Sequence, residues 1–234
     1  MAGLLRGSAE TRSDFIQALV YIDHKPAWEP IAQQLGSSDL NVQAASAWAL
    51  GQLGVKEALQ PLWGARSTVD PSNRMITETA LLQLGPALEQ TVVLARDGTT
   101  DSVQIGAFNH LAQIDPATAI FFLEEVLENK ALSARPGIFA AAMSSGQPSL
   151  KAALIRMSER LTDEEKVILV GAIADQQSSG YEDLLLKYLK SENPALSHAA
   201  VDALGWVGSD KSFEAMVAYA QKNLENQSDK GSVF

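Results

Sequence analysis

Residues 49–54 read ALGQLG, and a closely similar hexapeptide, ALGWVG, returns at residues 203–208. A third version, ALLQLG, occupies residues 80–85. Weaker copies begin at Ala18, Ala107, Ala141 and Ala172. These seven copies, the anchors of the sequence, follow one another at intervals of 27 to 34 residues. A period of this length is typical of repeat proteins, in which each repeat is one supersecondary unit.

Each anchor is followed, thirteen and fourteen residues later, by a pair of apolar residues. The pairs are Ile31-Ala32, Leu62-Trp63, Val93-Leu94, Ile120-Phe121, Leu154-Ile155, Leu185-Leu186 and Met216-Val217. Hydrophobic residues make up only 46% of the chain, so this regularity marks a second buried segment in every unit. The pattern predicts seven units of two helices, the first ending near the anchor and the second centred on the pair.

Capping signals agree with this division. Asp39 stands before the first helix of the second unit as an N-cap, and Gly54 follows that helix as a C-cap. Thr162 and Glu165 predict a capping box at the start of the sixth unit. No segment alternates long enough with period two to predict a strand. The prediction is an all-α chain.

Two short helices cannot bury their apolar stripes alone, so neighbouring units must stack around one continuous core. We therefore expect an α-α superhelix, or solenoid, of about seven two-helix repeats over residues 8–223. Residues 1–7 are expected to be an N-terminal lead-in. Residues 224–234 are expected to form a frayed or disordered C-terminal tail.

Composition excludes several classes of function. The 234 residues contain no cysteine, which excludes disulfides, thiolate metal sites and cysteine nucleophiles. The net charge is −10, and the acidic excess is spread over both halves, so no basic half is available to grip nucleic-acid phosphates. The longest apolar run, residues 167–174, is far shorter than the roughly 18 residues of a membrane span. We expect a cytoplasmic protein, with an exported form that has lost its leader left open.

The anchors lie within longer stretches that resemble a known family. Residues 39–54, DLNVQAASAWALGQLG, followed by EALQPL at residues 57–62, resemble a HEAT-like repeat of the short type first described in phycobilisome lyases. Residues 193–208 are similar. The family pattern has arginine six residues before the anchor and proline twelve residues after it. At these positions the chain has Arg12, Arg74 and Arg135, with lysine at Lys166, and Pro30 and Pro61.

No constellation of residues indicates catalysis or metal binding. His24, His110 and His198 are scattered, and no pair of them has metal-ligand spacing. Carboxylates gather at helix starts, where the helix dipole explains them, and serines gather at turns. We therefore expect no catalytic residue, no metal and no cofactor.

Partner-binding residues are sought on the second helices. The resemblance implies that the face opposite each apolar pair lines the concave side of the array. Trp28 is added because it starts the second helix of the end repeat, where one neighbour is missing. Trp48 and Trp206 are expected between layers, and Trp63 in the core. The predicted partner-binding residues are Trp28, Glu29, Gln33, Gln60, Thr118, Phe122, Arg156, Asp183 and Lys187.

The leading hypothesis is a non-enzymatic scaffold that binds a partner protein or peptide along the concave face. One alternative, a HEAT-like DNA glycosylase, needs a basic groove that this acidic chain is not expected to form. A second alternative, a bilin lyase-like activity, is implied by the repeat type alone. A third is assembly through the ends of the array, where Trp28 or Tyr219 would dock.

Overall fold

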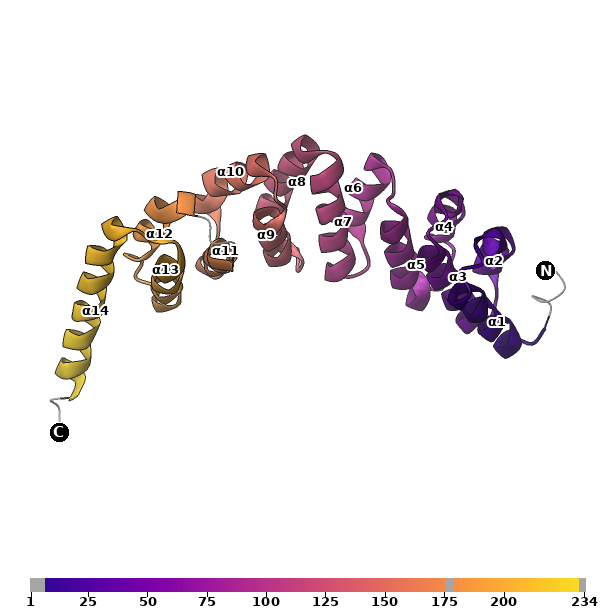
Figure 1. Ribbon diagram of the computed structural model, residues 1–234, viewed down its shortest axis with the longest axis horizontal. Helices are drawn as coiled ribbons and strands as arrows, with labels where there is room; N and C mark the ends of the chain where they lie inside the picture. Colours follow the sequence, from indigo (N-terminus) through magenta and orange to yellow (C-terminus); the bar gives the residue numbers. More distant parts are fainter. Residues whose placement is uncertain (1–6, 176–178, 232–234) are drawn as a thin grey trace. The chain divides into compact units, whose positions relative to one another are not determined.

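The computed structural model describes residues 7–175 and 179–231, and it divides the chain into two compact units. Unit 1 is Met1–Ala119 and unit 2 is Ile120–Phe234. The described residues form fourteen α-helices and no strand (Figure 1). This confirms the all-α prediction, and the fourteen helices correspond to the seven predicted pairs. None of the described helices is both long enough and apolar enough to cross a lipid bilayer.

The first helices of the seven repeats are of similar length. They are α1 (Ala9–Tyr21), α3 (Leu40–Leu53), α5 (Pro71–Leu84), α7 (Asp101–Ile114), α9 (Arg135–Ser144), α11 (Asp163–Asp175) and α13 (Pro194–Val207).

The second helices vary more in length. They are α2 (Trp28–Ala32), α4 (Leu59–Ala65), α6 (Leu88–Asp97), α8 (Pro116–Glu128), α10 (Pro148–Met157), α12 (Glu182–Tyr188) and α14 (Asp210–Gly231). Short 3-10 turns flank them at Lys25–Ala27, Gln33–Gly36, Lys56–Ala58, Ser158–Arg160 and Ser179–Tyr181.

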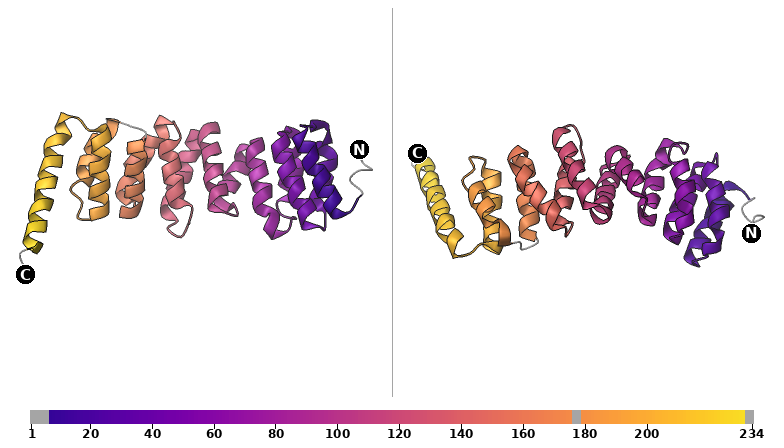
Figure 2. Two further views of the ribbon diagram at one scale, coloured as in Figure 1. Left: turned by 60° about the horizontal axis from the view of Figure 1, so that its bottom comes forward. Right: turned by 90° about the horizontal axis from the view of Figure 1, so that it is seen from above.

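Within unit 1, the first helices α1, α3, α5 and α7 pack side by side in sequence order (Figures 1 and 2). Each of α2, α4 and α6 packs against the first helix of the following repeat. The core lies between these two layers and includes the fully buried Leu50, Leu62, Leu81 and Leu94. The predicted stacking of helical hairpins into a solenoid is therefore present.

Within unit 2, α9, α11 and α13 form the corresponding layer of first helices. There α10 packs against α9, and α12 packs against α13 and α14. The last helix, α14, extends to Gly231 and so continues past residue 224, where a tail is predicted. Residues 1–6 of the predicted lead-in and residues 232–234 of the predicted tail lie outside the described residues.

The helix ends follow the predicted capping chemistry. Oδ1 of Asp39 accepts hydrogen bonds from the backbone N–H groups of Asn41 and Val42, at 3.0 and 3.1 Å. The Thr162 N–H donates to Oε2 of Glu165 at 2.9 Å, and the Glu165 N–H donates to Oγ1 of Thr162 at 3.3 Å. Both the N-cap and the capping box are confirmed.

The glycines of the anchor hexapeptide have separate roles. Gly54 ends α3 with φ of 65°, a left-handed conformation that a side chain disfavours. Gly51 instead lies where α3 meets α5, because a Cβ added there would be 2.9 Å from Cα of Ala80. Gly51 therefore allows α3 and α5 to approach closely.

Buried polar groups join successive repeats. In unit 1, the fully buried Glu78 accepts hydrogen bonds from Nε of Arg66 at 2.8 Å, Nε of Arg74 at 3.2 Å and the N–H of Thr99 at 2.8 Å. Because Arg66 ends α4 and Thr99 follows α6, this one carboxylate joins three repeats.

In unit 2, successive repeats are joined by Arg135, one of the arginines placed six residues before an anchor. Its guanidinium donates to both carboxylate oxygens of Glu165 and to the carbonyl oxygens of Val126 and Leu127, the latter at 2.6 Å. The two carbonyls belong to the last turn of α8, so Arg135 satisfies groups that the helix itself leaves unpaired.

Candidate protein-binding site

The nine predicted partner-binding residues do not form one surface hollow. Six of them are exposed: Glu29, Gln33, Gln60, Arg156, Asp183 and Lys187. Trp28 and Thr118 are partly buried. None of the nine lines any of three surface hollows. One hollow lies on α1 and α3, one between α3 and α5, and one between α13 and α14.

Three of the predicted residues have structural partners. The hydroxyl of Thr118 donates to Oδ2 of Asp115 at 2.9 Å and so belongs to the start of α8. On α12, Asp183 pairs with the ammonium group of Lys211, and Lys187 pairs with Glu159. All four of these charged side chains are more than half exposed, so the pairs contribute little to stability.

Phe122 contradicts its prediction. Its side chain is only 4% exposed, whereas the adjacent Phe121 is 72% exposed. The cause is a shift of register in the fourth repeat: the buried residues of α7 follow those of α3 when His110, not Ala107, is matched to Ala49. With that shift, the exposed aromatic residue of α8 is Phe121.

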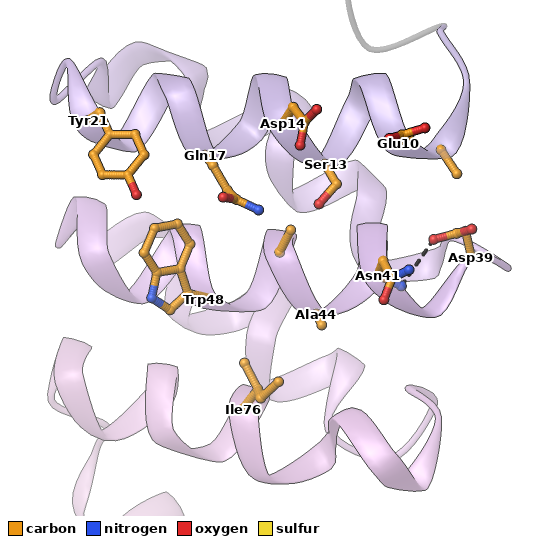
Figure 3. A pocket seen from close by; sticks show the side chains of 12 residues that line it. Glu10, Ser13, Asp14, Gln17, Tyr21, Asp39, Asn41, Ala44, Trp48 and Ile76 are labelled. Atoms are coloured by element: carbon orange, nitrogen blue, oxygen red, sulfur yellow. Dashed lines mark hydrogen bonds between the residues drawn. The ribbon is translucent and has the colours of Figure 1, made fainter.

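The largest of the three hollows, of about 930 Å³, lies on the first helices of unit 1 and is called the first-helix hollow (Figure 3). Its walls come from α1 and α3, and Ile76 of α5 closes one side. The lining residues are Ala9, Glu10, Ser13, Asp14, Gln17, Tyr21, Asp39, Asn41, Ala44, Ala45, Trp48 and Ile76. The binding face is predicted on the second helices, but this hollow belongs to the opposite layer.

The two ends of the first-helix hollow differ in chemistry. Tyr21 and Trp48 lie together at the C-terminal ends of α1 and α3, while Glu10 and Asp39 lie at the N-terminal ends (Figure 3). Asp14 lies between the ends on α1. Ala44 and Ala45 keep the floor shallow, because their side chains are short.

Charges on the first-helix hollow have one sign. Its twelve lining residues include three carboxylates and no lysine or arginine. Asp39 uses Oδ1 to cap α3, whereas Glu10 and Asp14 are exposed on α1. Among the described residues that line this hollow, only Glu10, Asp14 and Asp39 are charged, so the hollow attracts cations.

Trp48 is also part of a smaller hollow. This depression of about 190 Å³ lies between α3 and α5 and is lined by Trp48, Met75, Ile76, Thr79, Ala80 and Gln83. Met75 is 44% exposed. The indole of Trp48 therefore stands between two depressions on one surface, partly buried, and not between the two helix layers as predicted.

The other predictions for tryptophan also need correction. Trp206 is 71% exposed, and Gln52 and Gln83, at the same position of their anchors, are exposed as well. Trp63 is only partly buried, and the guanidinium of Arg66 lies 5.6 Å from its ring centroid. The exposure of a tryptophan near an anchor thus depends on its position along the helix.

Unit 2 has its own hollow, of about 490 Å³, between α13, α14 and the segment that follows α12. His198 and Tyr219 meet there edge to face, with ring centroids 6.1 Å apart. The hydroxyl groups of Tyr219 and Ser197 lie 3.1 Å apart. These contacts tie Tyr219, a residue predicted to dock a partner, to the neighbouring helix. Among the described residues, no group of three or more His, Asp or Glu side chains is placed to hold a metal ion.

Helical hairpins stacked side by side in sequence order define an α-α repeat protein. A family model described as HEAT repeats matches residues 2–82 and 161–226, together more than half of the chain. The chain therefore belongs to the HEAT-repeat proteins, which confirms the resemblance found in the sequence. HEAT repeats generally mediate protein–protein interaction. No curated protein matches the chain.

Proposed function

We propose that this chain is a non-catalytic interaction module that binds a segment of a partner protein in the first-helix hollow of unit 1. The observation that carries the proposal is the pair of aromatic side chains, Tyr21 and Trp48, at one end of a hollow of about 930 Å³. Tyr21 is 81% exposed, an unusual position for a large aromatic ring in a folded chain. Tyrosine and tryptophan are also the residue types enriched at the energetic centres of protein interfaces.

The support beneath this hollow is rigid, which favours recognition. Its walls are helices whose other faces are fully buried through Ile16, Val42 and Leu50. A binding surface that is already formed loses little conformational freedom when a partner binds. A few aromatic contacts then contribute to affinity without the entropy cost of ordering a loop.

The charge of the surface favours a protein partner over nucleic acid. The lining of the first-helix hollow is acidic, and phosphate groups would be repelled there. Elsewhere, arginines that could bind phosphate are engaged internally: Arg66 and Arg74 with Glu78, and Arg135 with Glu165. These observations argue against the glycosylase-type alternative.

Selection of peptides from a random display library tests the proposal without knowledge of the partner. Twelve-residue peptides that bind the wild-type chain would be screened against Trp48→Ala and against Trp206→Ala. Trp206 is the matched control, because it is a similarly anchor-linked tryptophan, is 71% exposed and lies outside the hollow. We expect enriched peptides to lose binding to Trp48→Ala and to keep it on Trp206→Ala.

Enriched peptides that bind both variants equally would contradict the proposal that the first-helix hollow is the binding site. Because Trp48 is partly buried, Tyr21→Ala is a second test variant whose fold is not at risk. Circular dichroism of each variant confirms that the helices are intact.

A further inference from the structure

The chemistry of the first-helix hollow limits what can occupy it. Resting on the proposed function, we infer that the bound segment is basic at one end and carries an apolar anchor residue about three to five positions away in an extended conformation. This apolar residue of the bound segment contacts Tyr21 and Trp48. The basic side chains lie against Glu10 and Asp14.

Apolar side chains gather at one end of the hollow. Tyr21 and Trp48 lie together there, and Ile76 and Met75 of α5 share the smaller depression with Trp48. An aliphatic or aromatic side chain placed at this end would remove apolar area from water on both molecules. Small side chains at Ala44 and Ala45 leave room for the backbone of the bound segment to follow the groove between α1 and α3.

Negative charge gathers at the other end. Glu10 and Asp39 lie there, Asp14 lies between the two ends, and the lining residues include no cation. A segment bearing lysine or arginine would be attracted before contact and paired after it. A second copy of this chain is a poor occupant, because two chains of net charge −10 repel each other and would bring more carboxylates to the site.

The distance between the two ends sets the spacing within the bound segment. Along α1, Tyr21 follows Asp14 by seven residues and Glu10 by eleven, which corresponds to about 10 and 16 Å at 1.5 Å per residue. An extended segment advances about 3.3–3.6 Å per residue. The two carboxylates therefore lie about three and five residues, along an extended segment, from the residue that contacts Tyr21 and Trp48, so a lysine three to five positions away can reach one of them.

A restricted peptide library tests the apolar anchor, the basic residues and their spacing together. Each peptide has twelve residues, one fixed leucine, and lysine, serine or glutamate at every other position. The library is selected on the wild-type chain and on Glu10→Gln/Asp14→Asn. The matched control is Glu57→Gln/Glu89→Gln, which removes the same charge from exposed residues outside the hollow.

We expect lysine to be enriched about three to five positions from the leucine on the wild-type chain and on the control. On Glu10→Gln/Asp14→Asn, the enriched peptides should bind about five- to tenfold more weakly, since each exposed ion pair contributes a modest factor. Raising NaCl from about 50 to about 500 mM should reduce the affinity of the wild-type chain toward that of the variant. Glu10 and Asp14 are exposed, so the double variant should remain folded.

Each contrary outcome has a definite meaning. Trp48-dependent binding with no lysine preference, or with lysine enriched at every spacing alike, would overturn this inference and leave the proposed function standing. Binding that does not depend on Trp48 would overturn both. Concentration-dependent dimers in light scattering that disappear in Trp48→Ala would identify a second copy as the occupant and overturn the inference.

Discussion

Replacing Gly51 by alanine tests how the repeats are packed. The new methyl group would lie 2.9 Å from Cα and 3.0 Å from Cβ of Ala80, and closer still to Oε1 of Gln83. The Gln83 side chain can move aside, but the backbone of α5 can move only if α3 and α5 separate. Carbon atoms in good contact are about 3.5–4.0 Å apart, so the required separation is roughly 0.5–1 Å.

The expected magnitude is a balance of two effects. Extra methyl groups in a well-packed contact cost about 1–3 kcal/mol, while alanine in place of glycine within a helix gains up to about 1 kcal/mol. We therefore expect Gly51→Ala to lower the free energy of unfolding by about 1–2 kcal/mol. Gly205 occupies the same position of the anchor hexapeptide in α13, where an added Cβ would meet nothing within 4 Å. Gly205→Ala should then raise stability by about 0.5–1 kcal/mol, because only the gain in helix propensity applies.

Thermal unfolding followed by far-ultraviolet circular dichroism measures both variants. Hydrogen-exchange mass spectrometry assigns the loss to α3 and α5 in Gly51→Ala. The decisive result is the opposite sign at two positions with the same sequence motif. If Gly51→Ala were as stable as the wild-type chain, or if Gly205→Ala lost as much as Gly51→Ala, the close approach of α3 and α5 would not explain the motif.

Three further predictions concern other parts of the chain. Phe122→Ala should lower the free energy of unfolding in urea by about 3–5 kcal/mol, because the Phe122 ring is only 4% exposed. Phe121→Ala should lower it by less than about 1 kcal/mol, because the Phe121 ring is 72% exposed. Equal effects would contradict the register of α8. Arg135→Lys should destabilise unit 2 by about 2–4 kcal/mol, since an ammonium group cannot serve both a bidentate carboxylate and two carbonyls; a thermal midpoint within about 1–2 °C of wild type would refute this role. Hydrogen bonds from the side chain and backbone of Ser72 hold the pKa of Asp70 below its ordinary value of 3.8. The stability that this carboxylate contributes is present above that value and is lost as the pH falls through the lower folded-state pKa, so Asp70→Asn should flatten the loss of stability below about pH 4. An unchanged acid limb in pH-dependent unfolding would contradict that assignment.

Much of the fold is readable from local sequence signals. The anchor hexapeptides, the apolar pairs and caps such as Asp39 and Thr162 act within one helix or one turn. Their effect depends on neighbours a few residues away, so the pairs of helices could be predicted without knowledge of their packing.

The candidate site was harder to predict because its position depends on register and on layer. In the fourth repeat, matching His110 instead of Ala107 to Ala49 moves the outward positions from Thr118 and Phe122 to Phe121 and Glu125. The choice of outward-facing residues from the apolar pair then placed the buried ring of Phe122 on the surface, because adjacent residues of a helix point about 100° apart. The burial pattern of α7, with Val103 and Gln104 inside, corrects this register.

Trp48 and Trp206 show that exposure depends on position along the helix. Trp48 stands one residue before its anchor, whereas Trp206 is the fourth residue of its own anchor. Trp48 is partly buried beside a hollow, and Trp206 is 71% exposed; Gln52 and Gln83, at the same position of their anchors, are exposed too. A signal available in the sequence was the ladder of α1 residues spaced three or four apart, Glu10, Asp14, Gln17 and Tyr21, which shares one helical face.

Short-range physics therefore accounts for the helices, their ends and their repetition, because hydrogen bonding, capping and apolar periodicity act over a few residues of one chain. The acidic and aromatic hollow arises between α1 and α3, whose residues are roughly thirty positions apart, one repeat period. Which side chains meet there depends on how closely the helices approach and which layer they form. Those contacts are properties of the packed repeats, and it is on them that the proposed binding by this protein depends.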